Sequence, residues 1–142
     1  MSESDMRTNL VDKLKKLDAC SVENPAGPET PDVQYIGGFI ELKWLRAWPK
    51  RPGTPVTLDH PLLASQKVWI KRRIRRGGAV WVLLQCGREW LLFRGDVAVE
   101  HLGTSTKAEL YDLAHAAWYE GLDTNELILT LEEWKECRKS TL

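Results

Sequence analysis

The spacing of apolar residues along the chain predicts helices separated by clear breaks. Residues 5–18 have the periodicity of an amphipathic helix, with apolar side chains at Met6, Leu10, Leu14 and Leu17. Three prolines and a glycine in the stretch ENPAGPETP (23–31) then interrupt regular structure. A second helix is predicted over residues 62–76, ending at the glycine pair 77–78.

Alternation of apolar and polar residues predicts four strands in two pairs. The first pair covers residues 32–36 and 39–45, and the glycine pair 37–38 between them suits a two-residue hairpin turn. The second pair covers residues 79–85 and 89–99. Each pair follows a predicted helix, so the strands are expected to form one sheet.

Helical periodicity returns in the last third of the chain. A helix is expected to begin at Thr106, where Glu109 completes a capping box, and to stop at Gly121. A last helix is predicted from residues 123–124 towards Lys139. The predicted order αββαββαα indicates an α/β fold, with a mixed central sheet flanked by helices and extra helices at the C-terminus.

Length and composition fit a single domain. The 142 residues, 43% of them hydrophobic, suffice for one buried core. We expect a core over about 1–102 and a helical segment over about 104–142 within one domain, 1–142. No apolar run is long enough to cross a bilayer, and the N-terminus lacks a signal-peptide pattern, so no membrane partner and a cytoplasmic location are expected.

One predicted strand carries charges that need an explanation. Side chains alternate along residues 39–45, so Glu41 and Lys43 share a face, while the opposite face is apolar: Ile40, Leu42 and Trp44. If residues 37–38 form the turn, Asp32 lies opposite Lys43, and three charged groups converge. A solvated salt bridge is the ordinary alternative. An apolar reverse face, however, indicates a strand internal to the sheet, where a carboxylate pair suits a hard divalent cation.

The net charge of zero conceals a strongly basic middle segment. Residues 43–94 contain 12 Lys and Arg side chains against 2 acids, a net charge of +10. Residues 1–42 carry −4 and residues 95–142 carry −6. Because a phosphate backbone responds to the local field, the middle segment is the candidate nucleic-acid surface.

Pro31-Asp32, followed nine residues later by Glu41-Leu42-Lys43, resembles the PD-(D/E)xK nuclease motif. The stretch LASQKVWIKRRIRRGGAVWVLL (63–84) resembles the glutamine helix, glycine pair and strand of the VRR-NUC branch of that superfamily. Together with TPDV, GGFIELKW and LDHPLLASQ, these stretches resemble small phage VRR-NUC proteins over roughly residues 1–100. Holliday junction resolvases belong to the same broad group, whose fold is restriction-endonuclease-like.

The resemblance implies a role for each matching residue. Asp32 and Glu41 would bind Mg²⁺ or Mn²⁺, with the main-chain carbonyl of Leu42 as a possible third ligand. Lys43 would be the catalytic lysine, and Gln66 corresponds to the motif glutamine. Gln66 also lies on an apolar helix stripe, so its side chain is expected to point at the sheet.

Two further groups of residues complete the expected site. Family members often add a glutamate near the start of the first helix; Glu3 fits by position, and Asp5 and Glu23 are rivals. A backbone clamp for DNA is expected from basic side chains of the proline-rich segment and the second helix: Lys50, Arg51, Lys67, Lys71, Arg72, Arg75 and Arg76. Three tryptophans occupy periodic positions and are assigned to packing: Trp69, Trp81 and Trp90.

The expected function is a Mg²⁺- or Mn²⁺-dependent endonuclease acting on branched DNA, four-way (Holliday) junctions first, and working as a homodimer without a small-molecule substrate. A nuclease for flaps, nicks or ends in phage replication or packaging is the alternative within the enzyme class. A catalytically idle DNA-binding module and an RNA-directed nuclease are two further hypotheses. The complete Asp32, Glu41 and Lys43 set argues against the idle module.

Overall fold

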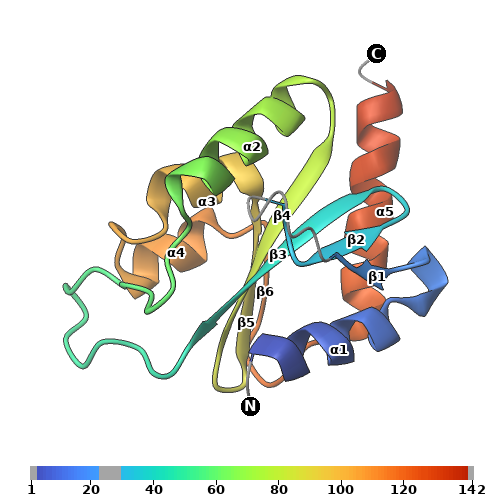
Figure 1. The fold of residues 1–142 in the computed structure, drawn as a ribbon. Coiled ribbons are helices and arrows are strands. Elements are labelled where there is room, and N and C mark those ends of the chain that lie inside the picture. Colours follow the sequence, from blue (N-terminus) through green and yellow to red (C-terminus); the bar gives the residue numbers. More distant parts are fainter. Residues whose placement is uncertain (1–2, 23–29, 141–142) are drawn as a thin grey trace.

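The computed structural model describes residues 3–22 and 30–140, and the side chains of residues 5–22 and 30–134. A six-stranded mixed sheet with strand order β1-β2-β3-β4-β5-β6 forms its centre, and helices lie on both faces (Figure 1). This arrangement confirms the predicted α/β class with a mixed central sheet flanked by helices.

The elements follow one another along the chain as α1 (Glu3–Lys13), a 3₁₀ turn η1 (Lys15–Leu17), β1 (Cys20–Ser21), β2 (Val33–Tyr35), β3 (Gly38–Leu45), α2 (Ala64–Arg75), β4 (Ala79–Cys86), β5 (Glu89–Arg94), α3 (Gly95–His101), α4 (Lys107–Leu113), β6 (Ala116–Trp118) and α5 (Thr124–Ser140). Antiparallel pairing joins every neighbouring pair of strands except β3 and β4, which run parallel because α2 carries the chain back across the sheet.

The hairpin between β2 and β3 turns one residue earlier than predicted. Val33 pairs with Ile40 and Tyr35 pairs with Gly38, so the two-residue turn is Ile36-Gly37 and Gly38 already belongs to β3. The glycine at position 38 serves close strand packing, since a Cβ there would lie 2.3 Å from the carbonyl oxygen of Ala79. The predicted turn 37–38 is therefore wrong, whereas the assignment of residues to faces of β3 is unchanged.

The segment after β4 also differs from its prediction. The strand expected over 89–99 ends at Arg94, and Gly95 begins α3. A Cβ at Gly95 would lie 2.7 Å from the Cγ2 atom of Ile70, so the glycine allows α3 to approach α2 closely. The apolar VAV sequence, expected to be strand, instead forms part of this helix.

A single helix from Thr106 to Gly121 is likewise not observed. The predicted capping box is present, with the amide of Glu109 donating to the Thr106 hydroxyl and the amide of Thr106 donating to the Glu109 carboxylate. The helix α4 then ends at Leu113, and residues 116–118 form β6, which pairs with β5. The expected helical C-terminal segment thus contributes a strand to the sheet, and β1 is a second strand that the sequence did not predict.

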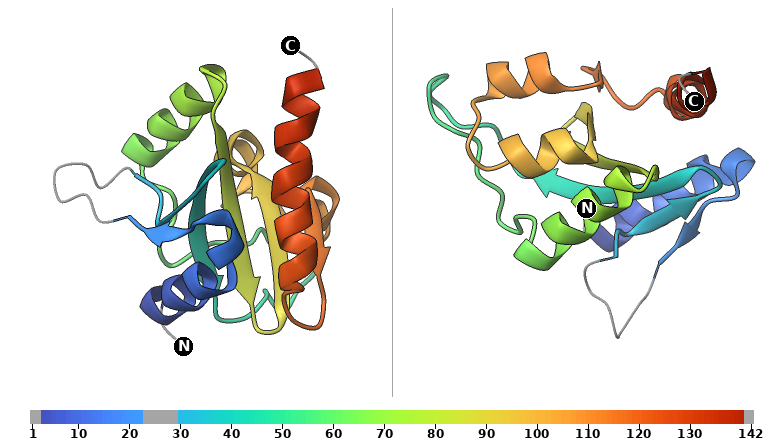
Figure 2. Two further views of the ribbon diagram at one scale, coloured as in Figure 1. Left: turned by 90° about the vertical axis from the view of Figure 1, so that its right-hand side faces the viewer. Right: turned by 90° about the horizontal axis from the view of Figure 1, so that it is seen from above.

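Two hydrophobic layers hold the sheet between the helices. Side chains of α1 and α5 pack on one face with Ile40 and Leu42, while α2, α3 and α4 cover the other face (Figure 2). The predicted last helix is confirmed, and its Leu127 and Leu131 are buried on the α1 face, which shows that α5 covers the sheet. The three tryptophans assigned to packing are all buried, which confirms that assignment: Trp69, Trp81 and Trp90. None of the described helices is long and apolar enough to span a membrane.

Candidate active site

The candidate site lies at the centre of the sheet, on the face covered by α2. Glu41 and Lys43 project from β3, which is internal to the sheet between β2 and β4 as the sequence predicted. Their exposed fractions are only 3% and 6%. Burying two ionised groups is costly unless each has partners, so the surrounding contacts decide what this pair can do.

Asp32 lies directly before β2, and two hydrogen bonds that involve side chains continue the pairing of β2 with β3 at this point. The amide of Leu42 donates to Asp32 Oδ2 at 2.9 Å, and the amide of Asp32 donates to Glu41 Oε1 at 3.2 Å. The observed register brings Asp32 to Glu41 and not, as predicted, opposite Lys43. The two carboxylates are therefore closer neighbours than the sequence analysis implied.

Gln66 reaches the same carboxylate from the first turn of α2. Its Nε2 atom donates to Glu41 Oε2 at 2.7 Å, and its Oε1 atom accepts the amide of Leu63 at 2.8 Å. The second bond satisfies a helix N-terminal amide and fixes which end of the amide faces Glu41. Gln66 thus points at the sheet, as its place on the apolar stripe predicted.

Lys43 completes the group from the same face of β3. Its Nζ atom lies 3.4 Å from Glu41 Oε2, the oxygen that also accepts from Gln66. Four of the residues singled out from sequence thus meet in one place: Asp32, Glu41, Lys43 and Gln66.

The electrostatics of the site centre on Glu41. Burial, followed by the hydrogen bond and negative charge of Asp32, raises the pKa of Glu41 from 4.5 to about 8, although Lys43 opposes this shift. Lys43 therefore does not outweigh the combined effect of burial and Asp32. The pair has an excess of negative charge that either a proton or a cation would relieve.

The donor set fits a hard divalent cation. Asp32 and Glu41 offer carboxylate oxygens, the ligands that Mg²⁺ and Mn²⁺ prefer. The amide of Leu42 points at Asp32, and the carbonyl of a strand residue points to the same side as its amide, so the Leu42 carbonyl also faces the Asp32 side of β3. Among the described residues no group of three or more His, Cys, Asp or Glu side chains that could hold a metal ion occurs, so side chains supply two carboxylates here.

Of the three acids considered for the upstream position, the structure describes the side chain of Asp5 alone. Asp5 is exposed on α1, and it does not join Asp32 and Glu41 in a three-acid cluster. The side chain of Glu3 and the whole of Glu23 lie outside the described residues.

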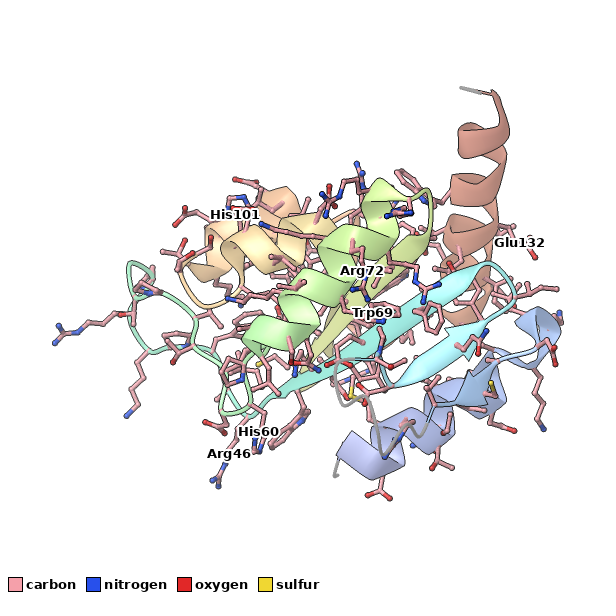
Figure 3. The ribbon with its side chains drawn as sticks, turned by 45° about the horizontal axis from the view of Figure 1, so that its top comes forward. Arg46, His60, Trp69, Arg72, His101 and Glu132 are labelled. Atoms are coloured by element: carbon pink, nitrogen blue, oxygen red, sulfur yellow. The ribbon has the colours of Figure 1, made fainter. Side chains whose placement is uncertain are left out.

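The basic residues expected to bind DNA lie at the surface of α2 and of the segment that precedes it. Lys50 and Arg51 are exposed in the segment between β3 and α2, from which Arg46 and His60 also project outward (Figure 3). On α2 and its C-cap, Arg72, Arg75 and Arg76 are exposed, as a solvated basic face requires, whereas Lys67 is half-buried. Lys71 differs because its Nζ atom forms a 3.0 Å ion pair with Glu100 of α3.

Sequence reasoning missed two groups of residues. Arg73 belongs to the basic helix, but its guanidinium lies over the rings of Trp69, at 4.6 Å, and Phe39, at 5.3 Å, where it supports packing of α2 on the hairpin. Glu89 binds Trp48 and Tyr111 at the far end of the sheet face. Its only sequence signal was that it is one of two acids in the basic middle segment.

Comparisons with known proteins leave the family open. No protein-family model matches the chain, and no curated protein matches its sequence. Among solved structures, the chain is similar to Hjc, a Holliday junction resolvase from the archaeal hyperthermophile Archaeoglobus fulgidus. The TM-score is 0.49 and the identity 20%, over 78% of this chain and 90% of that one. A likeness at this level assigns no function to the present chain.

The raised pKa of Glu41 predicts how the stability of the metal-free protein depends on pH. A carboxyl whose pKa is higher in the folded than in the unfolded chain stabilises fully below the unfolded value, and this contribution is lost as the pH rises through the folded value. The free energy of unfolding should therefore fall between about pH 4.5 and pH 8, relative to a Glu41→Gln variant, by an amount on the order of a few kcal/mol.

Urea denaturation of both proteins across this pH range, in EDTA, measures that difference. Added Mg²⁺ should stabilise the wild type more at the upper end of the range than at the lower end, because the cation and the proton compete for the same oxygens. A pH-independent difference between the wild type and Glu41→Gln would show that folding does not raise the pKa of Glu41.

Proposed function

We propose that this chain is a divalent-metal-dependent DNA endonuclease of the PD-(D/E)xK superfamily, in its VRR-NUC branch. The observation that carries the proposal is the bonded group of Asp32, Glu41, Lys43 and Gln66 on one internal strand and its neighbours. An ordinary surface salt bridge would be exposed, but here a lysine and a glutamate are buried together beside a second carboxylate. Such a cluster costs stability, and groups of this kind are concentrated at functional sites.

The proposed reaction is hydrolysis of a phosphodiester. Water attacks the phosphorus, the bond to the 3′ oxygen breaks, and the products carry a 3′-hydroxyl and a 5′-phosphate. A bound Mg²⁺ or Mn²⁺ ion, held by Asp32, Glu41 and the Leu42 carbonyl, would polarise the phosphate and lower the pKa of water.

The chain's own residues supply orientation and charge. Lys43, fixed beside Glu41, directs an ammonium group at the position where negative charge grows on the phosphate and helps orient the attacking water. Gln66 acts on Glu41 by holding one of its oxygens, so that the carboxylate keeps one orientation. Gln66 is accordingly a positioning residue, anchored in turn by the Leu63 amide.

The proposed substrate is branched DNA, four-way junctions first, and this part of the proposal rests on the sequence resemblance. The exposed cations of α2 and of the segment between β3 and α2 suit contacts to phosphates, which recognise shape and not sequence. A junction is resolved by two symmetrical cuts, and a homodimer supplies two equivalent sites.

Removal of the lysine should abolish cutting. Lys43→Ala is expected to lower the cleavage rate of an end-labelled four-way junction by at least about 100-fold, since a preorganised cation is lost where charge develops. Gel analysis with Mg²⁺, with Mn²⁺ and with EDTA measures this, and Lys16→Ala, an exposed lysine outside the site, serves as the matched control.

Different outcomes of the same assay separate the rival functions. Equal cutting of the junction and of a linear duplex would support nuclease activity and contradict a preference for junctions. Tight binding without cutting under any metal would leave a catalytically idle binding module. Preference for a 2′-hydroxy substrate would redirect the proposal to RNA.

The two neighbouring cations Arg72 and Lys71 provide a matched test of the DNA surface. Arg72 is exposed, whereas Lys71 is already ion-paired with Glu100. Arg72→Ala should weaken DNA binding and reduce the salt slope of the binding constant by about 1, and Lys71→Ala should change both less. Binding titrations in EDTA at several salt concentrations check this, and equal effects of both variants would contradict the assigned surface.

A further inference from the structure

A cavity opens on the same sheet face, beside the C-terminal end of β3. It lies between the segment after β3, the start of β5 and α4, and its volume is about 480 Å³. Its walls include aromatic rings and its rim includes cations: Trp48, Tyr111, Tyr119, Lys50, Arg51 and Lys107. Pockets for small organic ligands have this size and this combination of apolar walls with a few polar groups.

Glu89 holds the walls of this cavity in place. The indole of Trp48 donates to Glu89 Oε2 at 2.6 Å, and the hydroxyl of Tyr111 donates to Oε1 at 2.5 Å. Lys107 Nζ lies 3.4 Å from the same Oε1 atom. These contacts engage both oxygens of Glu89, so the carboxylate connects three separate segments and its charge is compensated.

Tyr119 offers an aromatic surface to a ligand. Its ring stacks on Tyr111 with centroids 5.1 Å apart and an interplanar angle of 8°. The residue is nevertheless 66% exposed, so the ring face turned away from Tyr111 is open to solvent. A flat ring that is held on one side and open on the other is a stacking platform for a planar group.

The charges around this platform favour an anion. Lys50 and Arg51 are exposed at the rim, and Glu89 is the only acidic side chain among the described residues that line the cavity. Since Glu89 is engaged by Lys107, the two rim cations are left in excess. A ligand that is both planar aromatic and anionic matches these walls, and a nucleotide has both properties.

The cavity lies close to the proposed active site. Leu45, two residues after Lys43 on the same face of β3, pairs with Cys86, which pairs with Glu89. Glu89 and Lys43 therefore point to the same side of the sheet, two strands apart, with Cα atoms separated by roughly 12 Å. This distance corresponds to about three or four base-pair steps of a DNA strand.

We propose that this cavity binds a single nucleotide, with its base stacked on Tyr119 and its phosphate beside Lys50 and Arg51. The source we infer is an unpaired nucleotide of the DNA, a few positions from the phosphate that is cut, and this source rests on the proposed function. A free mononucleotide presents the same chemistry and forms a separate arm of the test.

The test uses binding in EDTA, so that it does not depend on cleavage. A duplex with one unpaired 2-aminopurine and the corresponding fully paired duplex are titrated with the full-length wild type, Tyr119→Ala and Tyr119→Phe. Leu129→Ala, which removes an exposed apolar side chain of α5 outside the cavity, is the matched control. Deoxyadenosine monophosphate is titrated alone in the second arm.

The wild type should bind the bulged duplex about 5- to 100-fold more tightly than the paired one and quench the 2-aminopurine fluorescence. Tyr119→Ala should lose the preference and the quenching, while Tyr119→Phe and Leu129→Ala keep both. If the mononucleotide binds in a Tyr119-dependent way but the bulged duplex is not preferred, the cavity is a nucleotide site whose ligand is a free nucleotide and not an unpaired nucleotide of DNA. Unchanged behaviour of Tyr119→Ala in both arms would overturn the pocket itself. If Tyr119-dependent binding is observed but the protein cuts no DNA, the proposed endonuclease activity is contradicted and the nucleotide site is retained.

Discussion

The bonds around the buried Glu41 carboxylate are the constraint on which the site depends. One oxygen accepts from the amide of Asp32, and the other accepts from Gln66 and lies beside Lys43. The hairpin, the internal strand and the crossover helix are thereby tied to one buried group. Burial, followed by the neighbouring Asp32, raises the pKa of Glu41. Two carboxylates beside a single lysine leave negative charge unbalanced. This imbalance is the physical reason to expect a cation at this position.

Much of this arrangement could be predicted because strand periodicity is a local property. Alternation along β3 assigned Glu41 and Lys43 to one face and the apolar residues to the other, and both assignments agree with the observed packing. The stripe on α2 likewise predicted that Gln66 points at the sheet, where it meets Glu41. Moving the turn by one residue shifts the pairing of the two strands by two residues, and a two-residue shift leaves every side chain on the same face of the sheet. The wrong turn at residues 37–38 therefore changed which charged residue lies opposite Asp32, but the same three charged residues still lie together.

The failures arose where tertiary contacts decide the structure. Gly38 and Gly95 looked like turn and strand residues, but each is needed for a close approach between elements that are distant in sequence. Residues 116–118 become a strand only because the edge of β5 is available for pairing, and helical periodicity gives no sign of this. The cavity around Glu89 was missed for the same reason, since its walls come from three segments that meet only in the folded chain.

The most direct test of the carboxylate pair is Mn²⁺ binding, followed by electron paramagnetic resonance at a pH above the pKa of Glu41. The account predicts that the wild type binds Mn²⁺, that Mg²⁺ displaces it, and that Asp32→Asn weakens binding by at least about tenfold. Asp59→Asn, which alters an exposed acid between β3 and α2, should bind as the wild type does. Equal Mn²⁺ affinity of Asp32→Asn and the wild type, or no binding by either, would contradict the assignment of this pair as the metal site.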